Sequence, residues 1–406
     1  MSWLVAVVGL AFLVLIHEAG HFFAARSLGM RPRRFYIGFP PAIAKVNRGG
    51  IEYGIGAIPL GGYVKIPGMH RPAPSDLDAH LSRAVHEAPE LTGSVERMKR
   101  RLERGEFTEG VELAALEASV KGVDLTPQAR RSAERGLTEL RDGLGNDAYW
   151  RARTWRRVAV IFAGPGTNLV FAIVLLAIVF AFGVRVATLS VSEVQPGSPA
   201  DLAGLRAGDR VVGVDGQRVG EFNEVYDAVQ QAEGTPITLV VDRGGRTQVI
   251  HVTPTHYLGQ NWAIGFRPGE RWERYSPAEA ISLSFGRTWE VTKAIGHGFS
   301  RLVTQEGRRD ISSPVGITRV SSQAVDTDFR VYLQLLAFIS LSLALLNLLP
   351  LLPLDGGHIA FSIVEGVRGR AVGREVYERV SVIGIALVLM LFFIGLSNDL
   401  GGNGPG

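Results

Sequence analysis

Two histidines and a glutamate lie close together in an apolar segment near the start of the chain, in the run HEAGH at residues 17–21. His17 and His21 are four residues apart, so on a helix both imidazoles project from one face and can bind one metal ion. Glu18 lies between them, placed to polarise a metal-bound water rather than to ligate the ion. Ionisable side chains within an apolar segment are costly unless paired or metal-bound, so we predict a catalytic metal site. The alternative is a proton relay or a hydrogen-bonded polar cluster in a helix bundle.

A catalytic zinc site usually has three protein ligands and a water, so a third ligand is required. Asp355 is the best candidate. It lies in NLLPLLPLDGGH, residues 347–358, where two prolines interrupt an apolar segment and two glycines let the backbone approach its neighbours. Irregular backbone at membrane depth is tolerated where it is buried or lines a cavity, which a site packed against the first helix would supply. His358 is the rival ligand, or else a structural histidine at a helix start.

The composition restricts both the metal site and the class of protein. The 406 residues include no cysteine, which excludes a disulfide framework, a cysteine-ligated zinc ribbon and a cysteine nucleophile. Any metal must therefore be held by histidine and carboxylate. The net charge of +4 is too small to imply nucleic-acid binding, so no nucleic-acid partner is expected. A mean hydropathy of +0.16 with only 20% charged residues argues against a wholly soluble chain.

Four apolar segments are long enough to cross a bilayer, and we place them at residues 1–27, 158–183, 331–350 and 380–397. A signal peptide is the alternative for the first, but no Lys or Arg precedes it and ionisable residues fall where a cleavage site would be. Arginines follow the first segment and precede the second and the fourth. By the positive-inside rule, both termini lie outside a plasma or inner membrane, and the loops of the active site lie on the cytoplasmic side.

The region between the first two spans divides into two parts. Residues 28–70 are predicted to form a membrane-associated β-hairpin, because EYGIGAIPLGGYVKIPG from Glu52 alternates and is rich in Gly, Tyr and Val. The glycines of this segment let its backbone approach another surface closely; they are Gly54, Gly56, Gly61 and Gly62. Residues 71–153 are about one-third charged, with helix formers at 95–104 and 109–121, and predict a solvated helical insertion on the cytoplasmic side. A docking platform is the alternative.

Residues 186–270 are predicted to form a small outer α+β domain, from short β-rich runs, glycine turns and an amphipathic helix near 222–231. This segment resembles a PDZ domain in PGSPA at 196–200, AGL at 203–205, GD at 208–209 and VDG at 214–216, with a closing strand at 263–266. Such domains capture a peptide or chain terminus at a sheet edge; the alternative is a steric spacer. Residues 275–305 are predicted to form an amphipathic interfacial helix, although a packed soluble helix fits nearly as well.

Together these features resemble the site-2 proteases, intramembrane zinc metalloproteases, and specifically the bacterial regulator-of-sigma-E-protease type. The resemblance covers nearly the whole chain except residues 71–153, and it adds AGPGTN at 163–168 and SPVGI at 313–317 to the motifs above. It implies that His17, His21 and Asp355 bind Zn²⁺ and that Glu18 is the general base. It also implies that Asn347 helps to hold substrate near the metal and that the glycine-rich hairpin pairs with the substrate as an added strand. No other cofactor is expected.

The chain departs from the family pattern in three places. The family has its second proline two residues after the first, whereas here that position is Leu352 and the proline is Pro353. Some members carry two tandem PDZ domains, whereas one is found here. The charged insertion is the third departure, and the resemblance says nothing of its role.

The expected fold is a membrane α-helical core of four transmembrane helices with a membrane-associated β-hairpin and one outer α+β PDZ domain. The expected function is intramembrane proteolysis. Substrates would be single-span membrane proteins already trimmed outside, admitted by the PDZ domain, and the resemblance suggests anti-sigma factors or signal-peptide remnants. A non-catalytic PDZ membrane adaptor with structural histidines competes with this reading. So does a transporter with a His and Asp relay, which explains neither the PDZ domain nor the HExxH order.

Overall fold

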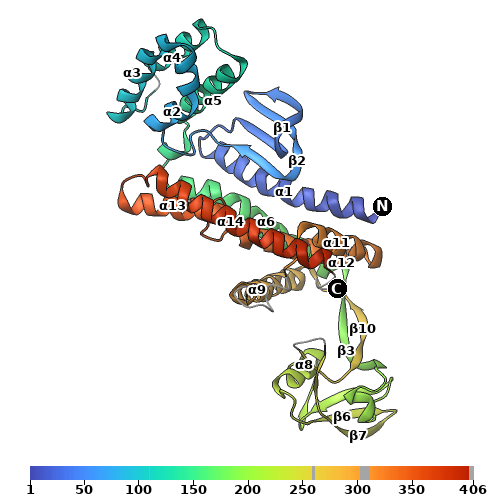
Figure 1. The fold of residues 1–406 in the computed structure, drawn as a ribbon. Helices are drawn as coiled ribbons and strands as arrows, with labels where there is room; N and C mark the ends of the chain where they lie inside the picture. The colour runs from blue at the N-terminus through green and yellow to red at the C-terminus, as the bar shows by residue number, and fades with distance from the viewer. Residues whose placement is uncertain (109, 258–260, 302–310, 402–406) are drawn as a thin grey trace. The chain divides into compact units, whose positions relative to one another are not determined.

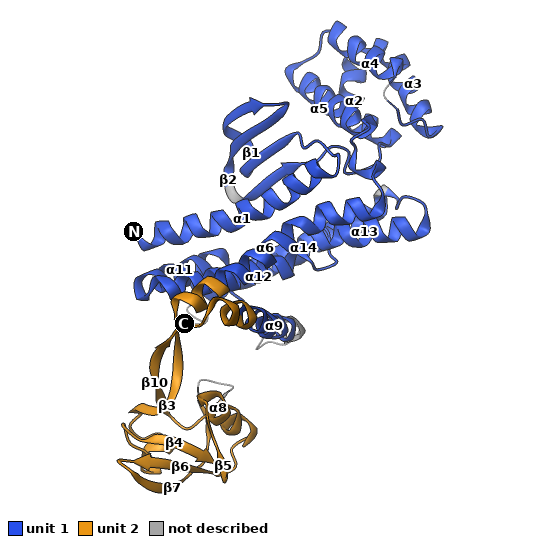
Figure 2. Ribbon diagram, turned by 180° about the vertical axis from the view of Figure 1, so that it is seen from behind, with its two compact units in different colours: residues 1–176, 284–406 blue, residues 177–283 orange. Residues whose placement is uncertain are grey.

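The computed structural model describes residues 1–108, 110–257, 261–301 and 311–401. The chain divides into two compact units (Figures 1 and 2). One unit comprises residues 1–176 and 284–406, and the other comprises residues 177–283. The side chains predicted to do chemistry belong to the first unit, and the segment predicted to form a PDZ domain belongs to the second.

The first unit is built around four helices that are long and apolar enough to cross a membrane. They are α1 (Ser2–Ser27), α6 (Thr154–Phe182), α12 (Phe329–Asn347) and α14 (Arg374–Leu400). In the most apolar window of α14 only 11% of the residues are buried, so its apolar side chains face outward, as in a lipid-exposed helix. The four predicted spans are thus found as helices, although α12 ends at Asn347, before the prolines that cannot continue it.

Two long strands follow α1 and form the hairpin. They are β1 (Arg34–Arg48) and β2 (Ile51–Lys65), joined at Gly49 and Gly50, whose positive φ angles favour glycine. Residues 34–37 pair both with 52–55 and with 62–65, so the strands are bent around them. The hairpin lies within the predicted residues 28–70, but the glycine-rich segment from Glu52 that indicated it supplies only the second strand. The first strand was missed because Pro40 and Pro41 interrupt its pattern, and the register shifts there.

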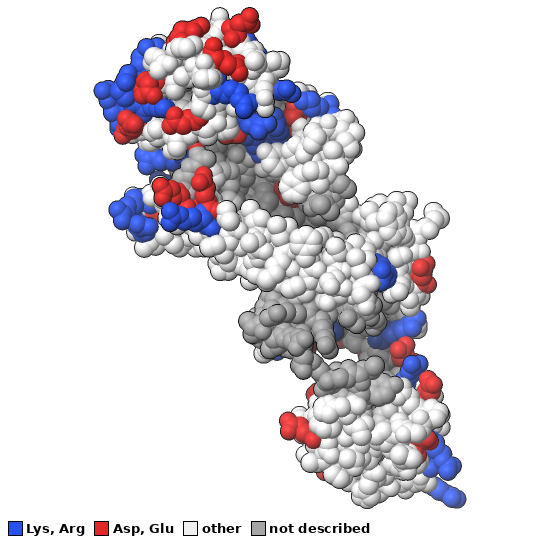
Figure 3. All heavy atoms as spheres, in the orientation of Figure 1, with Lys and Arg blue, Asp and Glu red and all other residues white. Residues whose placement is uncertain are grey.

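The charged insertion forms a helical domain with its own core. Its helices are α2 (Pro74–Glu87), α3 (Thr92–Glu103), α4 (Val111–Gly122) and α5 (Pro127–Leu144), with short 3₁₀ turns at Pro89–Leu91 and Tyr149–Arg151. Leu81, Leu91, Met98 and Leu116 are fully buried between them. Charged side chains of both signs gather over these helices, whereas the middle of α14 shows none (Figure 3). Helices were predicted over 95–104 and 109–121; residue 109 itself lies outside the described residues, and α2 and α5 were not predicted.

One buried carboxylate joins the insertion to both ends of the hairpin. Asp142 of α5 is only 6% exposed, and it pairs with Arg33 just before β1 (2.9 Å) and with Lys65 at the end of β2 (3.0 Å). Arg33 also pairs with Asp147 at 2.9 Å. The backbone N–H of Tyr149 donates to the carbonyl of Pro67 at 2.9 Å. The insertion therefore holds the start of β1 and the end of β2 in place.

Three further helices follow: α9 (Pro277–Arg301), which begins in the second unit and continues into the first, and α11 (Pro314–Thr327) and α13 (Asp355–Arg368), which belong to the first. The SPVGI segment starts α11, where the backbone N–H groups of Ser313 and Gly316 donate to Asp399 of α14 at 2.7 and 3.1 Å. A carboxylate at a helix N-terminus is stabilising, so this motif has a structural role here. The predicted amphipathic helix forms as α9 up to residue 301, and residues 302–305 of that prediction lie outside the described residues.

The second unit is an α+β fold, as predicted. Its six-stranded sheet has the order β10-β3-β4-β6-β7 with β5 paired to β4. The elements are β3 (Val184–Val194), α7 (Pro199–Leu202), β4 (Arg210–Val214), β5 (Gln217–Arg218), α8 (Phe222–Gln231), β6 (Ile237–Arg243), β7 (Arg246–Val252), β8 (Thr255–Tyr257), β9 (Asn261–Ala263) and β10 (Phe266–Glu273). Arg243 pairs with the buried Asp209 at 2.6 Å and holds the pKa of that carboxyl below its usual range. The closing strand, expected at 263–266, is β10 and begins at Phe266.

Candidate active site

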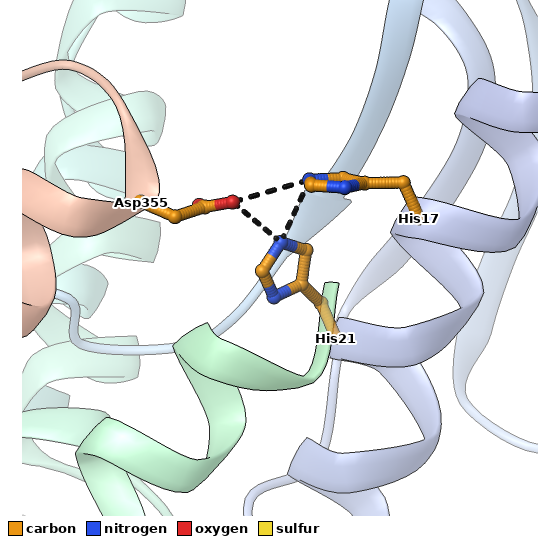
Figure 4. A group of neighbouring side chains, drawn as sticks. All are labelled: His17, His21 and Asp355. Carbon is orange, nitrogen blue, oxygen red and sulfur yellow. Dashed lines mark hydrogen bonds and ion pairs between the residues drawn. The ribbon is translucent and has the colours of Figure 1, made fainter. Parts of the chain in front are cut away.

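The two histidines lie one turn apart on α1 and face the interior of the first unit. His17 and His21 are each only 7% exposed, and their Nε2 atoms are 3.3 Å apart. Helical spacing alone accounts for this, because side chains four residues apart share one face. The pair therefore presents two imidazole nitrogens to a single point, as Figure 4 shows.

The third predicted ligand reaches the same point from a distant part of the chain. Asp355 is the first residue of α13, and its Oδ2 lies 3.1 Å from His17 Nε2 and 3.3 Å from His21 Nε2 (Figure 4). The two glycines that follow make this turn feasible. A Cβ atom on Gly356 would collide with the carbonyl oxygens of residues 348 and 349, and one on Gly357 would approach the backbone of residues 351 and 352. The glycines thus allow the chain to double back onto the end of α12.

The departure at Leu352 is accommodated by close packing. Leu352 is fully buried, and its carbonyl oxygen lies where a Cβ atom on Gly384 of α14 would be. A larger residue at position 384 would therefore displace the segment that leads to Asp355. The segment with its second proline shifted to position 353 is held in place by its contact with α14.

The three side chains fit a zinc ion. Ligands at about 2.0 to 2.1 Å from a tetrahedral zinc are separated by about 3.3 Å, close to the 3.1–3.3 Å separations found here. Two imidazole nitrogens and one carboxylate oxygen make up a donor set that catalytic zinc sites use. The Asp355 Oδ2 atom is buried and accepts no conventional hydrogen bond from the described residues, as expected of an oxygen reserved for a cation. No second cluster of this kind occurs in the described part of the chain.

The AGPGTN motif lets α6 pack closely against the histidine face of α1. A Cβ atom on Gly164 would collide with the His21 ring, and one on Gly20 would collide with the Ala163 carbonyl. The Nδ1–H of His21 donates to the carbonyl of Val160 in α6 at 2.9 Å. This bond leaves Nε2 with a free lone pair directed at the cluster, which is the usual arrangement of a metal-binding histidine.

The side chain of Glu18 extends from α1 toward β2 of the hairpin. It interacts electrostatically with His17, His21 and Asp355, and its carboxylate accepts a hydrogen bond from the backbone N–H of Val64. A Cβ atom on Gly62 would collide with the Glu18 side chain, so a glycine is required at that approach. Glu18 is therefore beside the cluster without belonging to it, as predicted for a general base.

The remaining predicted substrate-binding residues face elsewhere. Gly54, Gly56 and Gly61 pack against β1, where their Cβ atoms would meet Ala44, Phe39 and Gly38. Asn347 donates from Nδ2 to the Leu343 carbonyl one turn back on α12, at 3.1 Å. Among the predicted substrate-binding residues, the described contacts thus place only Gly62 beside Glu18, and a role in substrate binding stays a prediction for all of them.

His358, the rival ligand, is hydrogen-bonded to Tyr377 and is not part of the metal cluster. Its Nδ1 lies 2.5 Å from the hydroxyl of Tyr377 on α14, and the cluster contains Asp355 instead. Further along α13, Glu365 pairs with Arg157 of α6 at 2.6 Å. Tyr149 bonds to Ser362 at 3.0 Å, and burial raises the pKa of Tyr149 to about 12. These contacts, none of which the sequence pattern indicated, anchor the helix that carries Asp355.

Comparison with known proteins settles the family. A sequence model described as peptidase family M50 matches residues 5–391. The chain belongs to peptidase family M50. Membership confirms the predicted site-2 protease family, the enzyme class of zinc metalloendopeptidase and zinc as the cofactor. With four helices able to span a bilayer, this family member is a membrane protein.

Several relatives cover almost the full chain. A protein of Agrobacterium fabrum, whose name describes it as a candidate zinc metalloprotease, is 30% identical over 96% of this chain and 93% of its own length. The protease named Eep of Enterococcus faecalis is 29% identical, over 97% of each chain. The zinc metalloprotease RasP of Geobacillus kaustophilus is 26% identical over 96% of this chain and 95% of its own. The alignments span both units, so the second unit belongs to the same architecture.

Proposed function

We propose that this M50 peptidase cleaves peptide bonds within or beside the transmembrane segment of single-span membrane proteins. The observation that supports it most is the depth of the cluster in α1. His21 lies six residues before the end of this 26-residue apolar helix, which is about 9 Å along its axis. A helix of this length spans the hydrocarbon core, so His17 and Asp355 meet inside the bilayer, nearer one surface. Only a substrate that enters the membrane can reach them.

The reaction follows from the arrangement of the side chains. His17, His21 and Asp355 would hold the zinc, and a zinc ion there supplies Lewis acidity that polarises a peptide carbonyl and lowers the pKa of water at the site. Glu18 is placed to accept the proton of the attacking water and to return it to the amine nitrogen of the departing chain. The close approach of Gly62 and Val64 to Glu18 directs that carboxylate toward the cluster.

The substrate segment must be extended before cleavage, because a helix hides its carbonyl groups in its own hydrogen bonds. The last part of β2 is suited to pair with it. Residues 62–65 pair with residues 34–37 on one side, and Gly62 lies against Glu18. A substrate strand added along residues 61–65 would therefore pass beside the catalytic base.

We place the active site near the cytoplasmic surface of a plasma or inner membrane. Support comes from the arginines at 26, 31, 33 and 34, which follow the catalytic end of α1, and from Arg156 and Arg157 at the start of α6. With this sidedness both termini and the second unit lie outside. The exposed apolar side chains of α9, which include Phe285 and Trp289, suit a helix at the outer interface.

The second unit would act as a PDZ domain that filters substrates. β10 lies at one edge of its sheet, so its outer side can receive an extended peptide or chain terminus. α8 lies near this edge, since the rings of Phe222 and Phe266 are 5.9 Å apart. Substrates still carrying a bulky outer domain would be excluded, and trimmed ones admitted. Anti-sigma factors and signal-peptide remnants are the substrate classes that the site-2 protease resemblance suggests.

The proposed function predicts cleavage inside a span. Purified protein in detergent, mixed with a trimmed single-span substrate, should release fragments whose new ends map by mass spectrometry to the substrate's apolar segment or its immediate flank. Chelation should abolish the cleavage and added zinc should restore it, because the ligand set fits zinc. Cleavage confined to soluble loops far from the span would contradict the proposal. A soluble, unfolded protein offered as substrate is the matched control and should remain intact.

If the second unit filters substrates, removing it should increase the cleavage of untrimmed substrates. The ends of this unit lie side by side: Val184 pairs with Glu273, and the Tyr275 N–H donates to the Phe180 carbonyl at 3.2 Å. Joining Gly183 to Arg274 through a short glycine linker would thus remove residues 184–273 without moving α6 or α9. The excised enzyme should cleave an untrimmed substrate faster than the full chain does, and a trimmed substrate at the same rate. Equal rates on the untrimmed substrate would make the unit a spacer.

A further inference from the structure

The side chain of Asn168 contacts His17 in a way that neither the predicted ligand set nor the mechanism uses. Asn168 lies in α6 at the end of AGPGTN, is fully buried, and places its Nδ2 atom 3.4 Å from His17 Nδ1. Its backbone is fixed as well, since the hydroxyl of Ser340 in α12 donates to the Asn168 carbonyl at 2.9 Å. A fully buried amide held by a second helix points at the rear nitrogen of a predicted metal ligand.

The chemistry of His17 decides which way this amide must face. His17 directs Nε2 at Asp355 and at His21, so Nε2 must carry the lone pair that binds a metal. A neutral imidazole then carries its hydrogen on Nδ1 and needs an acceptor there. The Nδ2 group of Asn168 is a donor and cannot serve, whereas Oδ1 can. Nitrogen and oxygen of an amide are assigned from the hydrogen-bond network, so the network at His17 requires the reversed orientation.

We propose that Asn168 is a positioning residue whose Oδ1 accepts the Nδ1–H of His17 and so holds this histidine in its metal-binding tautomer and orientation. His21 has the equivalent contact from the Val160 carbonyl, so both histidines are oriented by acceptors on α6. The second amide atom of Asn168, on the side away from His17, has no hydrogen-bond partner among the described residues in either orientation. It therefore does not favour one orientation of the amide over the other. The inference rests on the proposed role of His17 as a zinc ligand.

The test measures zinc affinity of the full-length protein in detergent by competition with a chromophoric chelator. Asn168→Leu removes the acceptor at similar volume and should weaken zinc binding by about 10- to 100-fold, the usual effect of losing such a partner. Asn168→Asp keeps an acceptor and should bind zinc nearly as tightly as the unmodified protein. Should the leucine variant fail to fold, Asn168→Ala gives the same comparison. The Co²⁺-substituted protein adds a spectroscopic readout, since a reoriented His17 would shift the ligand-field bands.

Ser340→Ala is the matched control, because it loosens the backbone of Asn168 without removing the amide, and it should weaken zinc binding much less than Asn168→Leu does. Unchanged affinity in the leucine and alanine variants would overturn the proposal, as would equal losses in the leucine and aspartate variants. An equal loss in Ser340→Ala would also overturn it, by assigning the effect to packing. His17→Ala separates this inference from the proposed function. If His17→Ala binds zinc normally, the proposed ligand set is wrong. If His17→Ala loses zinc but the Asn168 variants keep it, only the proposed role of Asn168 is wrong.

Discussion

Purified Glu18→Gln protein should keep its zinc and lose cleavage of a membrane substrate by about 10²- to 10⁴-fold, the range expected for loss of a general base. Glutamine has nearly the shape of glutamate, so it can still lie between Gly62 and the cluster. It cannot accept a proton at neutral pH. The zinc should remain because the cluster of His17, His21 and Asp355 does not include Glu18. Zinc content is measured by atomic absorption and cleavage by gel assay of a tagged single-span substrate.

Glu103→Gln is the matched control for that experiment. It makes the same chemical change at an exposed position at the end of α3, in the insertion, and should leave both zinc and activity unchanged. Undiminished proteolysis by the Glu18→Gln protein would remove Glu18 from the mechanism. Loss of zinc together with activity would instead show that Glu18 supports the ligand site, and would leave the identity of the base open.

The metal cluster could be predicted from the sequence because local rules fix most of it. The spacing of His17 and His21 places two imidazoles on one helix face whatever surrounds the helix. Asp355 could be singled out because prolines and glycines break an apolar helix beside it, where regular structure cannot hide a carboxylate. The close packing of Gly20 and Gly164, which brings α6 against the histidines, shows why small residues recur in both segments.

The features that escaped prediction depend on contacts between distant parts of the chain. The β1 strand contains Pro40 and Pro41, and it is stabilised by residues 52–55 and 62–65 on either side rather than by its own pattern. Asp142 is one acidic residue among many in a charged segment, and only the fold brings it to Arg33 and Lys65. The contact between Asn168 and His17 spans 151 positions in the sequence, so no local periodicity could reveal it.

The same distinction separates Asp355 from His358, which sequence reasoning left as rivals. Both lie within one turn of α13, and either side chain is a zinc ligand by type. In the structure the carboxylate of Asp355 meets both histidines, whereas Nδ1 of His358 is bonded to Tyr377. Position within the turn, rather than chemical type, selects the ligand, and this choice leads to an expectation about metal content.

Asp355→Ala should therefore lose both zinc and cleavage, while His358→Gln should keep its zinc. Without Asp355, the ion keeps only two imidazole ligands and loses the one negatively charged side chain of the cluster. The zinc affinity should therefore fall by more than the roughly 100-fold that is lost with a residue that only hydrogen-bonds to a ligand. His358→Gln keeps a side chain able to bond with Tyr377 and is the matched control on the same helix. Zinc content after dialysis against a weak chelator is the measurement. Retention of zinc by Asp355→Ala, with loss in His358→Gln, would reverse the ligand assignment, because the metal would then be held one turn deeper in α13, next to α14.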